Sequence, residues 1–214
     1  MSSQTQTTAS GDSSDPVEHL LDAALMHVVF DGWSTATFEA AIAESGIDPV
    51  LARALCPRGA VDLALAYHRR GDRQMLQRLA EADLTGYRFR DKIAAAVRFR
   101  LEVAEDKEAV RRGTTLFALP QYAGDGLKAL WGTCDAIWNA LGDNSDDLNW
   151  YSKRTTLSGV YSTTLLYWLG DDSLDHQATW DFLDRRIDGV MQFEKVKAGL
   201  QKNPLLKPLL AGPN

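Results

Sequence analysis

The chain has 214 residues, of which 45% are hydrophobic, and a formal net charge of −6 at neutral pH. This length can bury a full core as one domain or two closely joined ones. The negative charge opposes a general affinity for nucleic acid or anionic lipid. No apolar run approaches the ~18 residues of a membrane-spanning helix. Cys56 and Cys134 form neither a disulfide framework nor a metal pair, which fits a reducing compartment.

The N-terminal half is predicted to be helical after a disordered tail. Residues 1–15 hold no basic and, after Met1, no large apolar residue, which argues against a secretory signal or an attached transit peptide. Apolar residues then recur with the 3.6-residue helical period. Gly32 ends the first helix, and Asp48 caps a short third helix that begins at Pro49. We expect helices over residues 17–32, 38–45, 49–57, 60–79, 86–105 and 107–119.

The C-terminal half continues this pattern. Apolar residues from Leu127 to Leu141 form one wide stripe that includes Cys134, a packed core thiol. A helix capped by Asp146 or Asp147 then runs to Gly170, and Ser173 is predicted to cap the last helix. Since strand signals are nearly absent, the sequence predicts an all-α fold.

No catalytic or metal-binding motif stands out. The histidines are scattered at positions 19, 27, 68 and 176, and none belongs to a Glu-x-x-His pair of the kind that a di-iron bundle needs. Phosphate-binding loops and nucleophile elbows are also missing from the sequence. The acidic run from Asp143 to Asp147 is better explained by helix capping than by calcium binding. We therefore expect no catalytic residue, no metal and no cofactor.

Five of the six tryptophans fall between residues 131 and 180. Aromatic side chains in a helical protein are usually core, but ligand sites also form between helices. The crowding predicts an elongated apolar cavity between the helices. Its predicted lining residues are Trp131, Trp138, Tyr161, Leu165, Trp168, Trp180 and Phe182.

The stretch Asp147-Leu-Asn-Trp-Tyr-Ser-Lys-Arg154 places aromatic residues beside cations, a combination that anchors partner proteins. Trp150 and Tyr151 are adjacent and cannot share one helix face, so one of them should face outward. The alternative is that both belong to the core. The predicted partner-binding residues are Leu148, Trp150, Tyr151, Lys153 and Arg154.

The C-terminal segment is locally basic. Residues 185–210 contain six basic and two acidic residues, interspersed with leucines, which indicates an anionic membrane surface as a contact. The alternatives are a tail that packs back on its own domain, and a helix interrupted at Pro204 and Pro208. The predicted membrane-binding residues are Phe193, Lys195, Lys197, Leu200, Leu205, Leu206, Leu209 and Leu210.

The first sixty residues after the tail resemble the N-terminal end of TetR-family regulators, through Gly32 and the run Ala41-Ile-Ala-Glu-Ser-Gly-Ile47. This resemblance implies a helix-turn-helix followed by a long helix. From residue 16 to residue 70, however, seven acidic residues outnumber four basic ones, and a DNA-reading unit should be basic. We therefore expect a vestigial helix-turn-helix that does not bind DNA.

A second resemblance, to the Coq-nine family of coenzyme Q biosynthesis, covers most of residues 17–200. Beside the 147–154 stretch it rests on Val160-Tyr-Ser-Thr-Thr164, Trp168-Leu-Gly-Asp171 and Thr179-Trp-Asp-Phe-Leu-Asp-Arg-Arg-Ile187. The resemblance implies a TetR-like helical bundle that binds isoprenoid lipid. It also implies that the chain meets the membrane through a C-terminal amphipathic helix and assists the demethoxyubiquinone hydroxylase.

Together these patterns predict a tail at 1–15, a helix-turn-helix-like part at 16–80, a lipid-binding bundle at 81–192 and a basic amphipathic segment at 193–214. The main hypothesis is a non-enzymatic accessory protein that presents an isoprenoid quinone to the hydroxylase. The alternatives are a TetR-type regulator with a lipidic effector, which a gel shift would reveal, and an enzyme acting on quinone precursors. We expect a peripheral protein of the bacterial inner membrane, or of the matrix side in mitochondria. Whether it forms a homodimer stays open.

Overall fold

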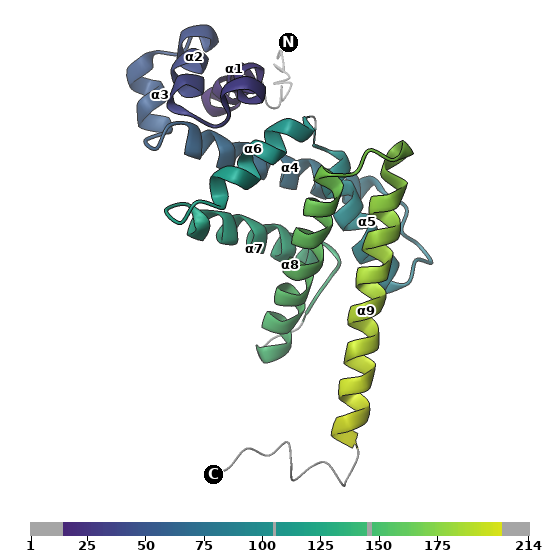
Figure 1. Cartoon of the computed structure of the whole chain (residues 1–214). Helices are drawn as coiled ribbons and strands as arrows, with labels where there is room; N and C mark the ends of the chain where they lie inside the picture. Colours follow the sequence, from purple (N-terminus) through teal and green to yellow (C-terminus); the bar gives the residue numbers. More distant parts are fainter. Residues whose placement is uncertain (1–14, 105, 145–146, 203–214) are drawn as a thin grey trace, which may run out of the picture. The chain divides into compact units, whose positions relative to one another are not determined.

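The computed structural model describes residues 15–104, 106–144 and 147–202, with backbone alone for residues 147, 148 and 193–202. Within these ranges the protein is all-α, with one short 3-10 turn and no strand (Figure 1). The predicted fold class is therefore confirmed. The elements are α1 (Pro16–Asp31), α2 (Thr35–Ser45), α3 (Pro49–Leu55), α4 (Ala60–Glu81), α5 (Phe89–Glu102), α6 (Lys107–Phe117), α7 (Ala123–Ala140), α8 (Asp147–Leu169), η1 (Leu174–His176) and α9 (Gln177–Lys202).

The helices group into two compact units. Among the described residues, the first unit comprises those up to 73 together with those from 104 to 129, and the second comprises 74–103 and those from 130 to 202. Because α6 packs with α1, it joins the N-terminal helices, although the sequence indicated a boundary near residue 80. The Trp33 indole secures this packing by donating a 3.1 Å hydrogen bond to the Ala109 carbonyl. A division of function at residue 80 stays a prediction.

The helix ends that local chemistry predicted are found in the structure. The Asp48 carboxylate accepts hydrogen bonds from the backbone amides of Val50 and Leu51 at 2.9 and 3.0 Å, which caps α3. Gly32 follows α1 with a φ of 64°, a conformation that glycine adopts without strain. Both features involve neighbours in sequence, which is why sequence patterns could indicate them.

The last helix begins later than predicted, although the hydroxyl of Ser173, the predicted cap, accepts a 3.1 Å hydrogen bond from the Ala178 amide in its first turn. Ser173 precedes η1, and α9 begins only at Gln177, because Asp175 and His176 have φ values of 51° and 56° that interrupt the helix. The Asp171 carboxylate accepts hydrogen bonds from Thr179 and from the Ser173 amide. These bonds hold the pKa of Asp171 well below its usual value and fix the turn between α8 and α9.

The helix that would read DNA in a helix-turn-helix protein is α3. It exposes Val50 and Leu51, at 77% and 45% of their surface. The guanidinium of its Arg53 forms a 2.6 Å salt bridge with Glu39 of α2. An apolar face with a paired cation is a poor match for a phosphate backbone. That this unit does not bind DNA stays a prediction.

Helices α6 and α7 approach closely at Gly126. A β-carbon added at this glycine would lie 2.7 Å from the β-carbon of Phe117, closer than side chains tolerate. Gly132, one and a half turns further along the same helix, has no such neighbour within 4 Å. The two glycines therefore form a matched pair for testing this contact.

We expect Gly126→Ala to lower the free energy of unfolding by about 1–2 kcal/mol, since overpacking outweighs the gain in helix propensity. Gly132→Ala should instead raise it by up to ~1 kcal/mol, because alanine is the better helix former. Urea unfolding followed by circular dichroism measures both. Equal effects of the two substitutions would contradict the close approach of Gly126 to Phe117.

Candidate functional site

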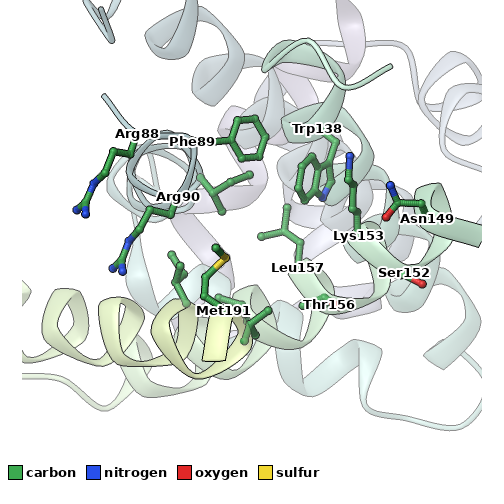
Figure 2. A pocket seen from close by; sticks show the side chains of 14 residues that line it. Arg88, Phe89, Arg90, Trp138, Asn149, Ser152, Lys153, Thr156, Leu157 and Met191 are labelled. Carbon is green, nitrogen blue, oxygen red and sulfur yellow. The ribbon is translucent and has the colours of Figure 1, made fainter. Parts of the chain in front are cut away.

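The second unit contains a cavity of about 580 Å³ (Figure 2). Eight of its lining side chains are apolar, three are polar and uncharged, and three are cationic. None of the described lining residues is acidic. The lining residues are Phe89, Ile93, Trp138, Leu157, Val160, Ile187, Val190 and Met191, then Asn149, Ser152 and Thr156, then Arg88, Arg90 and Lys153.

Helical spacing places these residues on shared faces. The residues that α8 contributes, between positions 149 and 160, are three or four apart and lie on one side of the helix. The start of α5 supplies Phe89, whose ring stacks on the Trp138 indole of α7 with centroids 5.4 Å apart. Four segments that are distant in sequence therefore enclose one apolar cleft, and we call it the α5–α8–α9 cleft.

The cations lie at the rim of this cleft. Figure 2 shows Arg88 and Arg90 on one side, and Lys153 on the other side beyond Trp138. The Arg88 Nε donates to an Asp91 carboxylate oxygen at 2.7 Å, and this bond holds the pKa of the Asp91 carboxyl below its usual value. Arg90 pairs with Asp188 of α9. The carboxylates that pair with these cations do not line the cleft.

A buried guanidinium holds α8 against the end of α7. Arg154 has no exposed surface. Its Nε donates to Asp135 at 2.5 Å, and its two terminal nitrogens donate to Asp143 and Asn139, each at 3.1 Å. Lys153 also donates to Asp143, at 2.6 Å. Arg154 thus binds acceptors within its own unit and does not present its charge to a partner surface, where the sequence had placed it.

The aromatic pair beside this guanidinium separates as expected. Tyr151 is the outward residue, with 59% of its surface exposed, whereas Trp150 is half-buried. The Trp150 ring lies 4.0 Å from the Arg154 guanidinium and 5.7 Å, centroid to centroid, from Trp131. Arg154 therefore fixes the Trp150 ring, and the Tyr151 ring packs edge-to-face against it. The Leu148 side chain lies outside the described residues.

Of the predicted lipid-binding residues, Trp138 lines the α5–α8–α9 cleft. Trp168 and Trp180 are buried around His176 in the turn before α9. Sequence reasoning missed the contribution of α5 because nothing local to residues 88–93 indicates which helices pack against them. The remaining predicted residues line no part of the cleft: Trp131, Tyr161, Leu165 and Phe182.

The predicted membrane segment is described only in part. The backbone of α9 is helical through Lys202, so Phe193, Lys195, Lys197 and Leu200 belong to this helix. Leu205, Leu206, Leu209 and Leu210 lie outside the described residues. Among the helices that are described, none is long and apolar enough to span a membrane. The same residues contain no cluster of three or more potential metal ligands.

Comparison with known proteins identifies the family. Residues 123–194 match the model of the COQ9 family. The ubiquinone biosynthesis protein COQ9 of Drosophila melanogaster is 32% identical over 180 residues, which are 82% of this chain and 55% of that protein. The probable coq9 protein of Dictyostelium discoideum is 28% identical over 194 residues, 86% of this chain and 62% of that protein. The predicted resemblance to the Coq-nine family is confirmed.

The COQ9 relatives are longer than this chain, which spans 55 to 62% of the length of the proteins from Dictyostelium discoideum, Drosophila melanogaster and Rattus norvegicus. Their names describe them as mitochondrial. Among solved structures, a TetR transcriptional regulator from Nitrosomonas europaea superimposes with a TM-score of 0.66 at 18% identity. The superposition covers 81% of this chain and 97% of the regulator. This similarity confirms the TetR-like fold.

Replacing Arg154 by methionine should lower the free energy of unfolding by about 3–5 kcal/mol, because Asp135 and Asp143 lose a buried, hydrogen-bonded cation. Asp143, whose side chain is only 3% exposed, keeps its 2.6 Å salt bridge with Lys153. Arg154→Met combined with Asp143→Asn should recover part of the loss, since the buried carboxylate is then replaced by a neutral amide. Urea unfolding of Arg154→Met, Asp143→Asn and the double variant measures these changes in the free energy of unfolding. Arg185→Met, at an exposed position of α9, is the control, and a similar loss there would contradict the role of Arg154.

Proposed function

We propose that this chain is a non-enzymatic, lipid-binding accessory protein of ubiquinone biosynthesis. It binds isoprenoid quinone intermediates and presents them to the demethoxyubiquinone hydroxylase. The observation that supports this most directly is the α5–α8–α9 cleft, ten of whose fourteen lining residues fall within the region that matches the COQ9 family. The names of the curated relatives supply the pathway.

The size and lining of the cleft suit such a ligand. Its volume of about 580 Å³ lies within the ~300–1,000 Å³ that is typical of small-molecule sites. Apolar side chains from α5, α8 and α9 provide a surface for an isoprenoid tail, while polar groups gather at the rim. Burying an isoprenoid methyl or methylene group here contributes about 0.8 kcal/mol per carbon.

We further propose that Tyr151 and Trp150 form the contact with the hydroxylase. Tyr151 is exposed, rigid and supported by Trp150, with ring centroids 4.8 Å apart in an edge-to-face arrangement. Pre-ordered aromatic residues of this kind dominate interface energies. Membrane contact through residues 193–214 belongs to the same proposal and rests on their sequence. It would place the protein on the inner membrane, on the matrix side in mitochondria.

The lipid proposal predicts that a bulky side chain at the cleft reduces binding. Thr156→Phe should weaken the affinity for decylubiquinone at least tenfold, because Thr156 is exposed, lines the cleft and can be enlarged without disturbing the core. Thr155→Phe is the matched control, since Thr155 is also exposed on α8 but does not line the cleft. Isothermal titration of the delipidated protein measures both affinities.

Unchanged binding in Thr156→Phe would place the quinone elsewhere. An equal loss in the two phenylalanine variants would mean that the surface of α8, and not the cleft, determines binding. Failure of the unmodified protein to bind decylubiquinone would contradict the lipid-binding function itself.

The partner proposal predicts that Tyr151→Ala weakens the affinity for the hydroxylase roughly 30-fold, the equivalent of ~2 kcal/mol for an interface anchor. Tyr87→Ala is the control, because Tyr87 is a tyrosine of the same unit with a similar exposure of 52%. Co-purification and biolayer interferometry measure the loss, and circular dichroism verifies the fold. Retained affinity in Tyr151→Ala, or equal losses in both variants, would refute this contact.

A further inference from the structure

The rim of the α5–α8–α9 cleft offers hydrogen-bond donors with positive charge. Arg88, Arg90 and Lys153 line it, and none of the described lining residues is acidic. The carboxylates of Asp91, Asp188 and Asp143 bind these cations from outside the lining. A guanidinium has five N–H groups, and Asp91 accepts two of those of Arg88, at 2.7 and 3.2 Å. The cleft therefore presents cationic donors to a bound molecule.

Two buried donors of the lining make no hydrogen bond among the described residues. They are Nε1 of Trp138, a residue with 9% of its surface exposed, and Nε of Arg90, which lies 3.4 Å from an Asp91 carboxylate oxygen. Native proteins rarely leave buried N–H groups without an acceptor, because desolvation is then uncompensated. Both residues line the same cleft, on opposite sides of Phe89 in Figure 2. The cleft thus combines cationic groups with an indole N–H, that of Trp138, which makes no hydrogen bond among the described residues.

We infer that the cleft selects its ligand by a head group that accepts hydrogen bonds and bears no positive charge. A carboxylate, a phosphate or the carbonyl oxygens of a quinone meet this requirement, whereas an ammonium head group is repelled. This inference rests on the proposed lipid-binding function and adds the chemistry of the head group. The apolar side chains of the cleft contact the hydrocarbon tail of the ligand, and Arg88, Arg90 and Lys153 bind its head group.

Three ligands of similar chain length test this selectivity on the full chain: dodecanoate, dodecylamine and decylubiquinone. At pH 7.5 the amine is protonated, as the lysine amine is, and the carboxylate is ionised. Isothermal titration at submicellar concentrations should show dodecanoate binding at least tenfold more tightly than dodecylamine. Decylubiquinone should also exceed dodecylamine. The ratio of the affinity for dodecanoate to the affinity for decylubiquinone separates the contribution of charge from that of hydrogen bonding.

Removing positive charges from the rim of the cleft should remove the preference for dodecanoate over dodecylamine. In Arg90→Gln/Lys153→Gln the ratio of dodecanoate to dodecylamine affinity should fall below about threefold. The control, Lys92→Gln/Arg185→Gln, removes the same charge from α5 and α9 at positions that do not line the cleft, and should keep the ratio. Because the double variant also affects the Asp143 pairs, Arg88→Gln provides a second test. The Arg88 side chain is 74% exposed, and its replacement should roughly halve the ratio without affecting the fold.

The outcomes distinguish the inference from the proposed function. Equal binding of dodecanoate and dodecylamine, with decylubiquinone also bound, overturns the selectivity and leaves the lipid-binding function supported. An equal loss of preference in the control variant also overturns it, because general surface charge would then be responsible. Failure of all three ligands to bind contradicts both.

Discussion

The buried guanidinium of Arg154 is the interaction on which the second unit depends. A buried charge is costly unless every donor finds an acceptor, and Asp135, Asn139 and Asp143 provide acceptors from α7 and the turn after it. The rotation of α8 about its own axis is fixed as a result. With Arg154 turned toward α7, Leu157 faces the cleft and Tyr151 faces outward. One ionic cluster thus orients both surfaces for which we propose functions.

Local chemistry explains which parts of the fold were predictable. The cap at Asp48 and the stop at Gly32 involve residues a few positions apart, so the sequence determines them directly. The interruption at Asp175 and His176 has no comparable signal. Neither residue is a glycine, yet both adopt positive φ where Asp171 and Ser173 bind the start of α9. That geometry depends on the packing of α8 and α9, which sequence patterns do not show.

The candidate site, too, was predictable only in the features that depend on local sequence. The concentration of aromatic residues correctly indicated burial, as in Trp138, Trp168 and Trp180, but not which of them share a cavity. Burial follows from side-chain chemistry, whereas the lining of a cleft follows from contacts between distant helices. Arg88 and Arg90 precede or begin α5, nearly sixty residues before α8 in sequence, and only the folded structure brings them to the cleft. Likewise, the motif around Arg154 was recognisable, but its buried position was not.

Helix α8 also links the proposed ligand and partner sites within one rigid element. Tyr151 and Thr156 are five residues apart, which corresponds to about 7.5 Å along the helix axis. A partner docked on Tyr151 therefore stands within two helical turns of the cleft rim, where Lys153 and the head group would meet. The TetR-like scaffold alone does not imply this arrangement, since a fold accommodates unrelated functions and the site determines which one applies. In the function that we propose, one face of α8 lines the cleft that holds the ligand, while Tyr151, exposed on the same helix, contacts the hydroxylase.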